Sequence, residues 1–156
     1  MTKDFTGRVV LITGAARGLG RATAARFIER GAHVAVNVRT PERAETLARE
    51  LGANSWPAPG DIRSSQTVRA LVAEIVERFG RLDVLVNNAA IASPTRIEQL
   101  TEEEWRATID TNLTAAFLCI QAVIRSMKKQ NCGRIINVSS LAGRCVSSLG
   151  GAPYTA

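Results

Sequence analysis

The sequence predicts an α/β protein with a doubly wound parallel sheet in the middle layer of a three-layer α/β/α arrangement. Apolar runs typical of strands alternate with amphipathic stretches typical of helices from residue 8 to residue 138. A glycine-rich segment separates the first strand from the first helix. Because no linker or internal repeat divides the 156 residues, we expect a single domain over 1–156.

The first half of the chain contains two strand–helix pairs. Residues 8–13 and 33–38 are β-branched apolar runs typical of buried strands. Between them a helix is expected over 18–30, with these side chains available for burial: Leu19, Ala22, Ala24, Phe27 and Ile28. The next helix is expected to have Thr40 as its cap and Pro41 in its first position, and to end at Gly52.

The second half continues the alternation. Residues 64–79 have the apolar spacing of a helix that lies on a sheet, and residues 82–87 form another strand. Thr101 and Glu104 form a capping box that opens a long helix. Its recurring apolar positions are Trp105, Ile109, Leu113, Phe117, Ile120 and Ile124. Residues 134–138 form the fifth strand, after which the fold is expected to be truncated.

The segment 55–59 is a weak strand because Pro57 and Pro59 cannot donate to a ladder. In the strand order 3-2-1-4-5 this strand lies at the edge of the sheet. Since the two prolines are two residues apart, both lack a donor on the same side. The fold tolerates them if that side faces outward.

Composition excludes several classes of function. The net charge of +6 is spread over the chain and aromatic content is 4%, so no basic stripe or stacking platform indicates nucleic-acid binding. Cys119, Cys132 and Cys145 lack the spacing of a disulfide framework or a metal site. Apolar runs are far shorter than the ~18 residues of a membrane span and no signal region follows the N-terminus, so we expect a cytoplasmic protein.

Residues 13–20 (TGAARGLG) lie between the first strand and the first helix, where a parallel sheet opens its crevice. Gly14 allows a tight turn, while Gly18 and Gly20 let the backbone approach a diphosphate at the helix N-terminus. This context favours a nucleotide-binding turn of the Rossmann type over a purely structural one. Spacing alone leaves both interpretations open.

Together with five further segments, this motif resembles the short-chain dehydrogenase/reductase family, of the β-ketoacyl carrier protein reductase type. The family's acidic residue after the third strand matches Asp61-Ile62, and its N-N-A-G segment matches Asn87 to Ala90, with Ala90 in place of glycine. Its helix asparagine matches Asn112, its serine after the fifth strand matches Ser140, and its tyrosine matches Tyr154. The matches run in order through nearly the whole chain.

The resemblance implies two sets of site residues. The catalytic residues would be Asn112, Ser140 and Tyr154, with one residue more than usual between the serine and the tyrosine. The cofactor-binding residues would be Thr13, Gly14, Arg17, Gly18, Leu19, Gly20, Arg39, Asp61, Ile62, Asn88, Ala89 and Ala90. Structural alternatives stay open: Asp61 could close a turn or cap a helix near Ser64, Asn112 could be a satisfied core amide, and Ser140 could merely begin a loop. Asn87 and Asn88 could simply close a strand, although their carboxamides could also stitch neighbouring loops beside the cofactor.

The end of the second strand, Asn37-Val38-Arg39, has a base where an NAD-type site would have an acid. Arg17 adds a second guanidinium, and paired arginines suit a 2′-phosphate. We therefore expect NADP(H) rather than NAD(H), with arginines that only meet solvent as the alternative.

The implied reaction is hydride transfer between the nicotinamide and a small carbonyl or alcohol substrate. Ser140 would bond the substrate oxygen and Tyr154 would donate its proton. The family's lysine, four residues after the tyrosine, would lie beyond Ala156, so we expect the chain by itself to be weak in stability and activity. A non-catalytic dinucleotide-binding protein is the alternative. The family often forms homodimers or tetramers through the long helix, which is our expectation for the complete protein.

Overall fold

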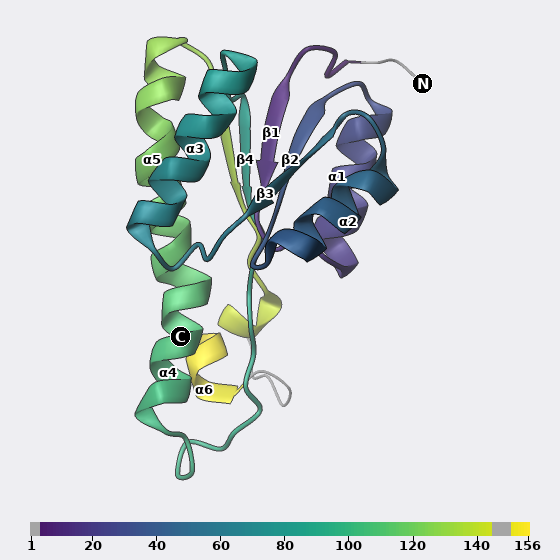
Figure 1. The fold of residues 1–156 in the computed structure, drawn as a ribbon. Helices are drawn as coiled ribbons and strands as arrows, with labels where there is room; N and C mark the ends of the chain where they lie inside the picture. Colours follow the sequence, from purple (N-terminus) through teal and green to yellow (C-terminus); the bar gives the residue numbers. More distant parts are fainter. Residues whose placement is uncertain (1–3, 145–150) are drawn as a thin grey trace.

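The structure, a computed structural model, describes residues 4–144 and 151–156. Its sheet contains five parallel strands in the order β3-β2-β1-β4-β5, which confirms the predicted doubly wound topology. The strands are β1 (Val9–Ile12), β2 (His33–Val38), β3 (Ser55–Pro59), β4 (Val84–Asn87) and β5 (Arg134–Asn137). Figure 1 shows the helices on both sides of this sheet.

Two separate cores fill the space between the sheet and its helices, because side chains alternate between the faces of each strand. Val10 and Ile12 of β1 pack with α1 (Gly18–Glu29) and α2 (Pro41–Leu51). Val9 and Leu11 face the opposite way and pack with α3 (Ser65–Phe79) and α5 (Ala115–Lys129). The sheet is therefore covered on both faces at β1, where its strands are most apolar.

The long helix is made of three segments: α4 (Glu102–Ile109), a π-helical turn (Asp110–Thr114) and α5. The predicted capping box of Thr101 and Glu104 is present at its start. Its buried stripe in α5 consists of Ala115, Cys119, Val123 and Met127. By length and composition alone, Glu102–Lys129 could span a membrane (mean hydropathy 1.4), but this stripe packs on the sheet.

Four of the apolar positions emphasised in the sequence are exposed, whereas Ile109 and Ile120 are partly buried and Ile120 packs against the core. Leu113 is 64% exposed and Phe117 57% exposed. The buried stripe and this exposed set of apolar side chains both repeat every three to four residues. The buried stripe has the smaller side chains, such as Ala115 and Cys119, which let the helix approach the strands. A large exposed apolar stripe therefore runs along the described part of the helix.

The prediction for α1 was wrong at its first turn. Leu19 is 61% exposed and Ala22 is also exposed, whereas Ala24 is buried and Phe27 and Ile28 are partly buried. Leu19 projects beyond the end of the sheet, where it lines a cavity instead of packing on a strand.

β3 lies at the edge of the sheet, as its prolines predicted. The Gly60 N–H donates to the Val38 carbonyl at 3.0 Å, so even-numbered residues of this segment point their donors at β2. Pro57 and Pro59 consequently place their missing donors on the outer side.

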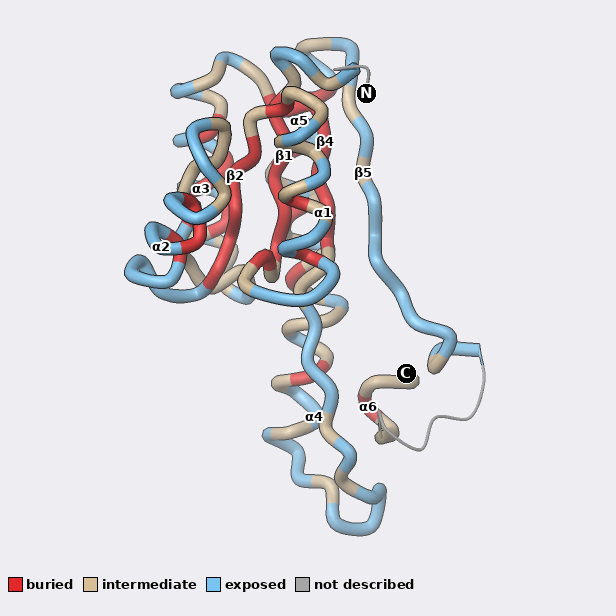
Figure 2. The backbone as a smooth tube through the Cα atoms, turned by 90° about the vertical axis from the view of Figure 1, so that its right-hand side faces the viewer, coloured by how far each residue is buried: buried red, intermediate tan, exposed pale blue. Residues whose placement is uncertain are grey.

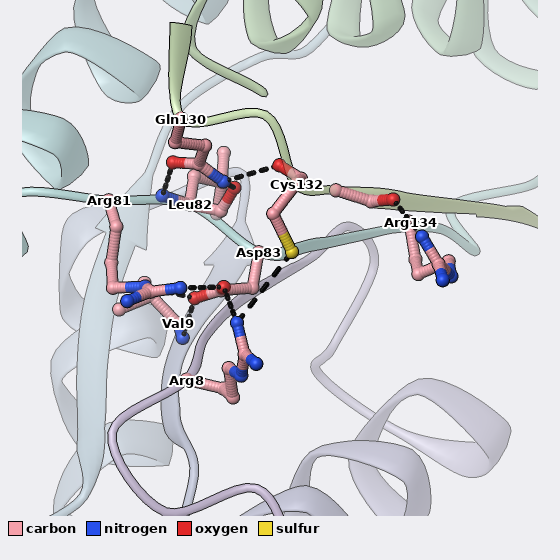
Figure 3. Close-up of polar contacts among 9 residues, drawn as sticks. Arg8, Val9, Arg81, Leu82, Asp83, Gln130, Cys132 and Arg134 are labelled. Carbon is pink, nitrogen blue, oxygen red and sulfur yellow. Dashed lines mark hydrogen bonds and ion pairs between the residues drawn. The ribbon is translucent and has the colours of Figure 1, made fainter. Parts of the chain in front are cut away.

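Asp83 links three strands at the end of the sheet where β1 and β4 begin, through its carboxylate and its main-chain carbonyl (Figure 3). Asp83, with a side chain only 3% exposed, accepts hydrogen bonds from the Val9 N–H at 2.9 Å and from the guanidinium groups of Arg8 and Arg81. Its own carbonyl accepts from the Arg134 N–H at 2.8 Å. This cluster lies at the opposite end of the strands from their carboxyl ends.

β5 is the least buried strand. Figure 2 shows it exposed along most of its length, and Ile136 is 45% exposed. The described residues therefore leave apolar surface of this strand and of the following Val138 (40% exposed) uncovered. Two short helices follow it, a 3-10 turn (Leu141–Gly143) and α6 (Gly151–Thr155).

Candidate active site

Two cavities adjoin at the carboxyl ends of the strands, the edge at which open parallel sheets bind ligands. The first has a volume of about 530 Å³ and the second about 510 Å³. Residues that line both include Ile62, Asn88, Ala89 and Ala90. A ligand that fills the first cavity therefore extends naturally into the second.

The glycine turn borders the first cavity and depends on its glycines for different reasons. Gly14 has φ +65° and lies so close to Ala89 that a Cβ atom would come within 2.6 Å of the Ala89 Cα. A Cβ at Gly20 would come within 2.5 Å of Asn88 Nδ2. Gly18 has φ +56° but would direct a Cβ into open space. Gly14 and Gly20 thus allow close packing of the turn on the loop at Asn88 and Ala89, whereas Gly18 leaves the cavity wall without a side chain at that point.

The start of α1 offers its backbone N–H groups to the same cavity. The residue before the helix is Arg17, and its side chain makes no capping hydrogen bond. The first turn contains no acidic residue. Free N–H groups and the positive end of the helix dipole suit an anionic group such as a diphosphate.

Thr13 and Asn88 hold this turn in place. The Thr13 hydroxyl accepts from the N–H groups of Asn88 (3.0 Å) and Ala89 (3.1 Å). In return, Asn88 Nδ2 donates to the carbonyls of Thr13 (3.0 Å) and Gly14 (3.2 Å). Asn88 therefore joins its own loop to the glycine turn, as predicted, whereas Asn87 joins the ends of two strands, β4 and β5, by donating to Asn137 Oδ1 at 2.8 Å.

Three exposed arginines line the first cavity. They are Arg17, Arg39 and Arg43, and none of them forms an ion pair with the part of the chain that the structure describes. Three guanidinium groups without an ion-pair partner among the described residues favour a ligand with a phosphate here.

Asp61 has a neighbour that the sequence did not suggest. Arg63 donates to its carboxylate through both Nε (3.0 Å) and Nη2 (2.6 Å). These hydrogen bonds lower the pKa of Asp61, with a smaller contribution from the nearby charge of Arg39. The Asp61 carbonyl also accepts from the Ser64 N–H, so the residue does close a turn. Its carboxylate is an ionised acceptor on the cavity wall that is already shared with a guanidinium.

Asn112 occupies the π-helical turn, where the Ala115 N–H donates to the Asp110 carbonyl five residues back. Its side chain makes a closed pair with the backbone of Ile91: Oδ1 accepts from the Ile91 N–H and Nδ2 donates to the Ile91 carbonyl, both at 2.9 Å. The amide is satisfied, as the structural alternative required, but it is partly exposed and borders the second cavity rather than the core. π-turns of this kind often mark functional positions.

Ser140 and Tyr154 line the second cavity with Asn112 and Thr13. Ser140 is exposed, and its hydroxyl accepts from the Ala142 N–H at 3.2 Å. Tyr154 is partly buried in α6. Residues 145–150 lie outside the described residues. They include Cys145 and part of the segment between Ser140 and Tyr154 that has one residue more than usual.

The structure thus brings all of the candidate residues to two adjoining cavities. The predicted cofactor-binding residues line the first, apart from Thr13, which borders the second with the three predicted catalytic residues. Sequence reasoning missed Arg43 and Arg63. Arg43 could have been noticed because it follows Arg39 by four residues across a helix start, whereas the position of Arg63 depends on the turn at Asp61.

Fold and site together define a doubly wound α/β protein of the Rossmann type with two adjoining cavities at the carboxyl ends of its strands. The short chain dehydrogenase family matches residues 8–156, and the chain belongs to this family.

Several curated relatives are 3-oxoacyl-(acyl-carrier-protein) reductases. The Staphylococcus aureus protein FabG is 41% identical over 150 residues, covering 94% of this chain and 61% of its own length. The Synechocystis reductase is 40% identical over 156 residues, covering 97% and 63%. The chain therefore spans about three fifths of the length of these relatives.

Among solved structures, a candidate short-chain alcohol dehydrogenase from Sinorhizobium meliloti 1021 superposes with a TM-score of 0.89. It is 34% identical in sequence, and the match covers 99% of this chain and 62% of the other. The whole described fold is thus shared with a larger protein of the family.

Proposed function

We propose that this chain forms the cofactor-binding and part of the catalytic region of an NADP(H)-dependent oxidoreductase that interconverts a carbonyl and an alcohol. The observation that carries the proposal is the continuity of the two cavities, one bordered by the glycine turn and the other by Asn112, Ser140 and Tyr154. When bound, the nicotinamide cofactor supplies or accepts the hydride.

The residues of the first cavity fit such a cofactor. The uncapped start of α1 and the bare wall at Gly18 would receive the diphosphate. Asp61 and Ile62 would meet the adenine, and Asn88, Ala89 and Ala90 would border the ribose and nicotinamide end. Arg17 and Arg39 would hold the 2′-phosphate, and we add Arg43 to this pair.

In the second cavity, each polar group has a distinct proposed role. The Ser140 hydroxyl would donate a hydrogen bond to the substrate oxygen, and the Tyr154 phenol would donate its proton to that oxygen as the carbonyl is reduced. Asn112 would keep the loop that begins at Ile91 against the helix. A 3-oxoacyl thioester is the first substrate to test, because the curated relatives are named for one.

The full-length protein is cytoplasmic and forms a homo-oligomer through the exposed stripe that includes Leu113 and Phe117. The 156-residue chain alone turns over slowly, because the family's lysine position is not part of it.

The test is a comparison of NADPH and NADH binding to this chain by fluorescence titration. We expect at least about tenfold tighter binding of NADPH, the equivalent of about 1.4 kcal/mol, since each guanidinium–phosphate contact is a charge-assisted hydrogen bond. Arg39→Ala and Arg43→Ala should each reduce this preference, while the matched control Arg49→Ala on α2, outside the cavity lining, should not. Equal affinities for both cofactors would reject the NADP assignment, and absence of binding would reject the nucleotide site itself.

A further inference from the structure

The loop between β4 and α4 is fastened to the long helix at two places. One is the pair between Asn112 and Ile91 described above. The other is Glu104, in the first turn of α4, which the proposed function does not use. Its Oε1 atom accepts hydrogen bonds from the hydroxyls of Thr95 (2.8 Å) and Ser93 (3.1 Å), and these hydroxyls lie 2.8 Å from each other.

The two carboxylate oxygens of Glu104 have different hydrogen-bond partners. Oε2 accepts from the Thr101 N–H at 3.2 Å, while the Glu104 N–H donates to the Thr101 hydroxyl, which completes the capping box. The pKa of Glu104 is lowered, first by the Thr95 hydroxyl and then by the Thr101 N–H. Glu104 is therefore a charged acceptor at neutral pH that joins the helix cap on one side to the loop on the other.

The segment held by Glu104 is also the surface on which α6 begins. Gly151 has φ +62°, and a Cβ atom built there would lie 2.1 Å from the Ser93 carbonyl oxygen and 3.2 Å from that of Thr95. Backbone therefore packs directly on backbone, and the two residues in contact are those whose hydroxyls Glu104 holds. α4 and α6 are themselves in contact.

Tyr154 follows Gly151 by three residues on the same short helix. We infer that Glu104 is a positioning residue for Tyr154: by fixing Ser93 and Thr95 it fixes the backbone on which α6 rests, and thereby the place of the phenol in the second cavity. The importance of this position for catalysis rests on the function proposed above, but the coupling itself is a property of the chain.

The coupling can be measured without turnover because Tyr154 is the chain's single tyrosine. Uniform incorporation of 3-fluorotyrosine gives one fluorine resonance that reports on residue 154 alone. Two variants separate the roles of Glu104. Ser93→Ala/Thr95→Val removes the hydroxyl contacts and leaves the cap, whereas Thr101→Ala weakens the cap and leaves the hydroxyl contacts. Circular dichroism is used to find conditions in which both variants are folded.

We expect the double variant to move the fluorine resonance by more than its linewidth and to increase its relaxation by a soluble paramagnetic probe. Thr101→Ala should leave both quantities at their wild-type values. Glu104→Ala should reproduce the double variant, and Glu104→Gln should restore the wild-type resonance because its amide can still bond the hydroxyls.

Two results would overturn the inference: an unchanged resonance in the double variant, or equal shifts in the double variant and in Thr101→Ala. The second result would mean that any loosening of the α4 start disturbs residue 154. Failure of NADPH binding would reject the proposed function and leave this measurement unaffected, so the two ideas fail separately.

Discussion

Replacing Asp83 by asparagine should destabilise the protein strongly although it lies far from the cavities. The carboxylate is 3% exposed and accepts from the buried Val9 N–H and from two guanidinium groups whose side chains are 44% and 40% exposed. Asparagine keeps the shape but presents an NH₂ group where every neighbour is a donor. The change therefore leaves Arg8 and Arg81 without their counter-charge and one acceptor too few for the site.

The magnitude follows from this environment. Removing one partner of a buried ion pair costs about 3–5 kcal/mol, and the lower value applies because both guanidinium groups can turn toward water. For a domain of this size, each kcal/mol lowers the melting temperature by about 2–4 °C, so about 3 kcal/mol corresponds to about 6–12 °C. The matched control is Asp4→Asn. Asp4 is 48% exposed, its partner Arg30 is 3.1 Å away, and the change should cost about 1 kcal/mol or less.

The destabilisation should depend on pH in a direction that the structure determines. Burial alone would raise the pKa of Asp83, but the hydrogen bonds from Arg81, the Val9 N–H and Arg8 outweigh it and hold the pKa below its ordinary value. A lowered folded-state pKa gives stability that is present above the unfolded value and is lost as pH falls through the folded value. The gap between wild type and Asp83→Asn should thus be full at neutral pH and close in acid, below about pH 4.

Urea unfolding followed by circular dichroism at pH 7 and at pH 3 measures both effects. If Asp83→Asn and Asp4→Asn have equal free energies of unfolding at pH 7, the buried Asp83 carboxylate contributes no more to stability than a surface ion pair, and the prediction is wrong. A gap that persists undiminished at pH 3 would show that the loss comes from packing instead of charge.

Two further predictions concern the glycine turn and the thiols. Gly18→Ala should cost about 1 kcal/mol in stability, because only the positive φ of Gly18 opposes the change, yet it should abolish cofactor binding. Gly20→Ala should cost several kcal/mol in stability, because its Cβ would clash with neighbouring atoms. Denaturation measures the stability of each variant, and NADPH titration measures its cofactor binding. In a Cys145→Ala background, a thiol reagent should label the exposed Cys132 quickly and Cys119 only on unfolding. Cys119 is buried, and burial raises its pKa to about 11. Two labels in the native state would contradict this prediction.

Strand order and the place of the glycine turn could be read from the sequence because they depend on local signals. β-branched runs, prolines confined to residues 55–59 and a glycine turn after the first strand each restrict the fold without reference to distant residues. The capping box at Thr101 is equally local. These elements were predicted correctly for that reason.

The features that sequence reasoning missed depend on contacts between distant segments or between competing faces. The local sequence does not single out Asp83, since its partners Arg8 and Val9 are more than 70 positions away. In the long helix, two apolar stripes have the same period, and only packing decides that Cys119 faces the sheet while Phe117 faces outward.

The two ends of the sheet have different physical tasks, and this explains where the chain can tolerate change. At one end, Asp83 joins β1, β4 and β5 through buried charge and hydrogen bonds, so substitutions there act on the folding equilibrium. At the other end, the glycine turn has little apolar surface of its own and is held by Thr13 and Asn88, so its geometry is set before any ligand arrives. A variant weakened at Asp83 should therefore bind NADPH with unchanged affinity in its folded fraction, whereas Asn88→Ala should lose affinity while much of its stability remains.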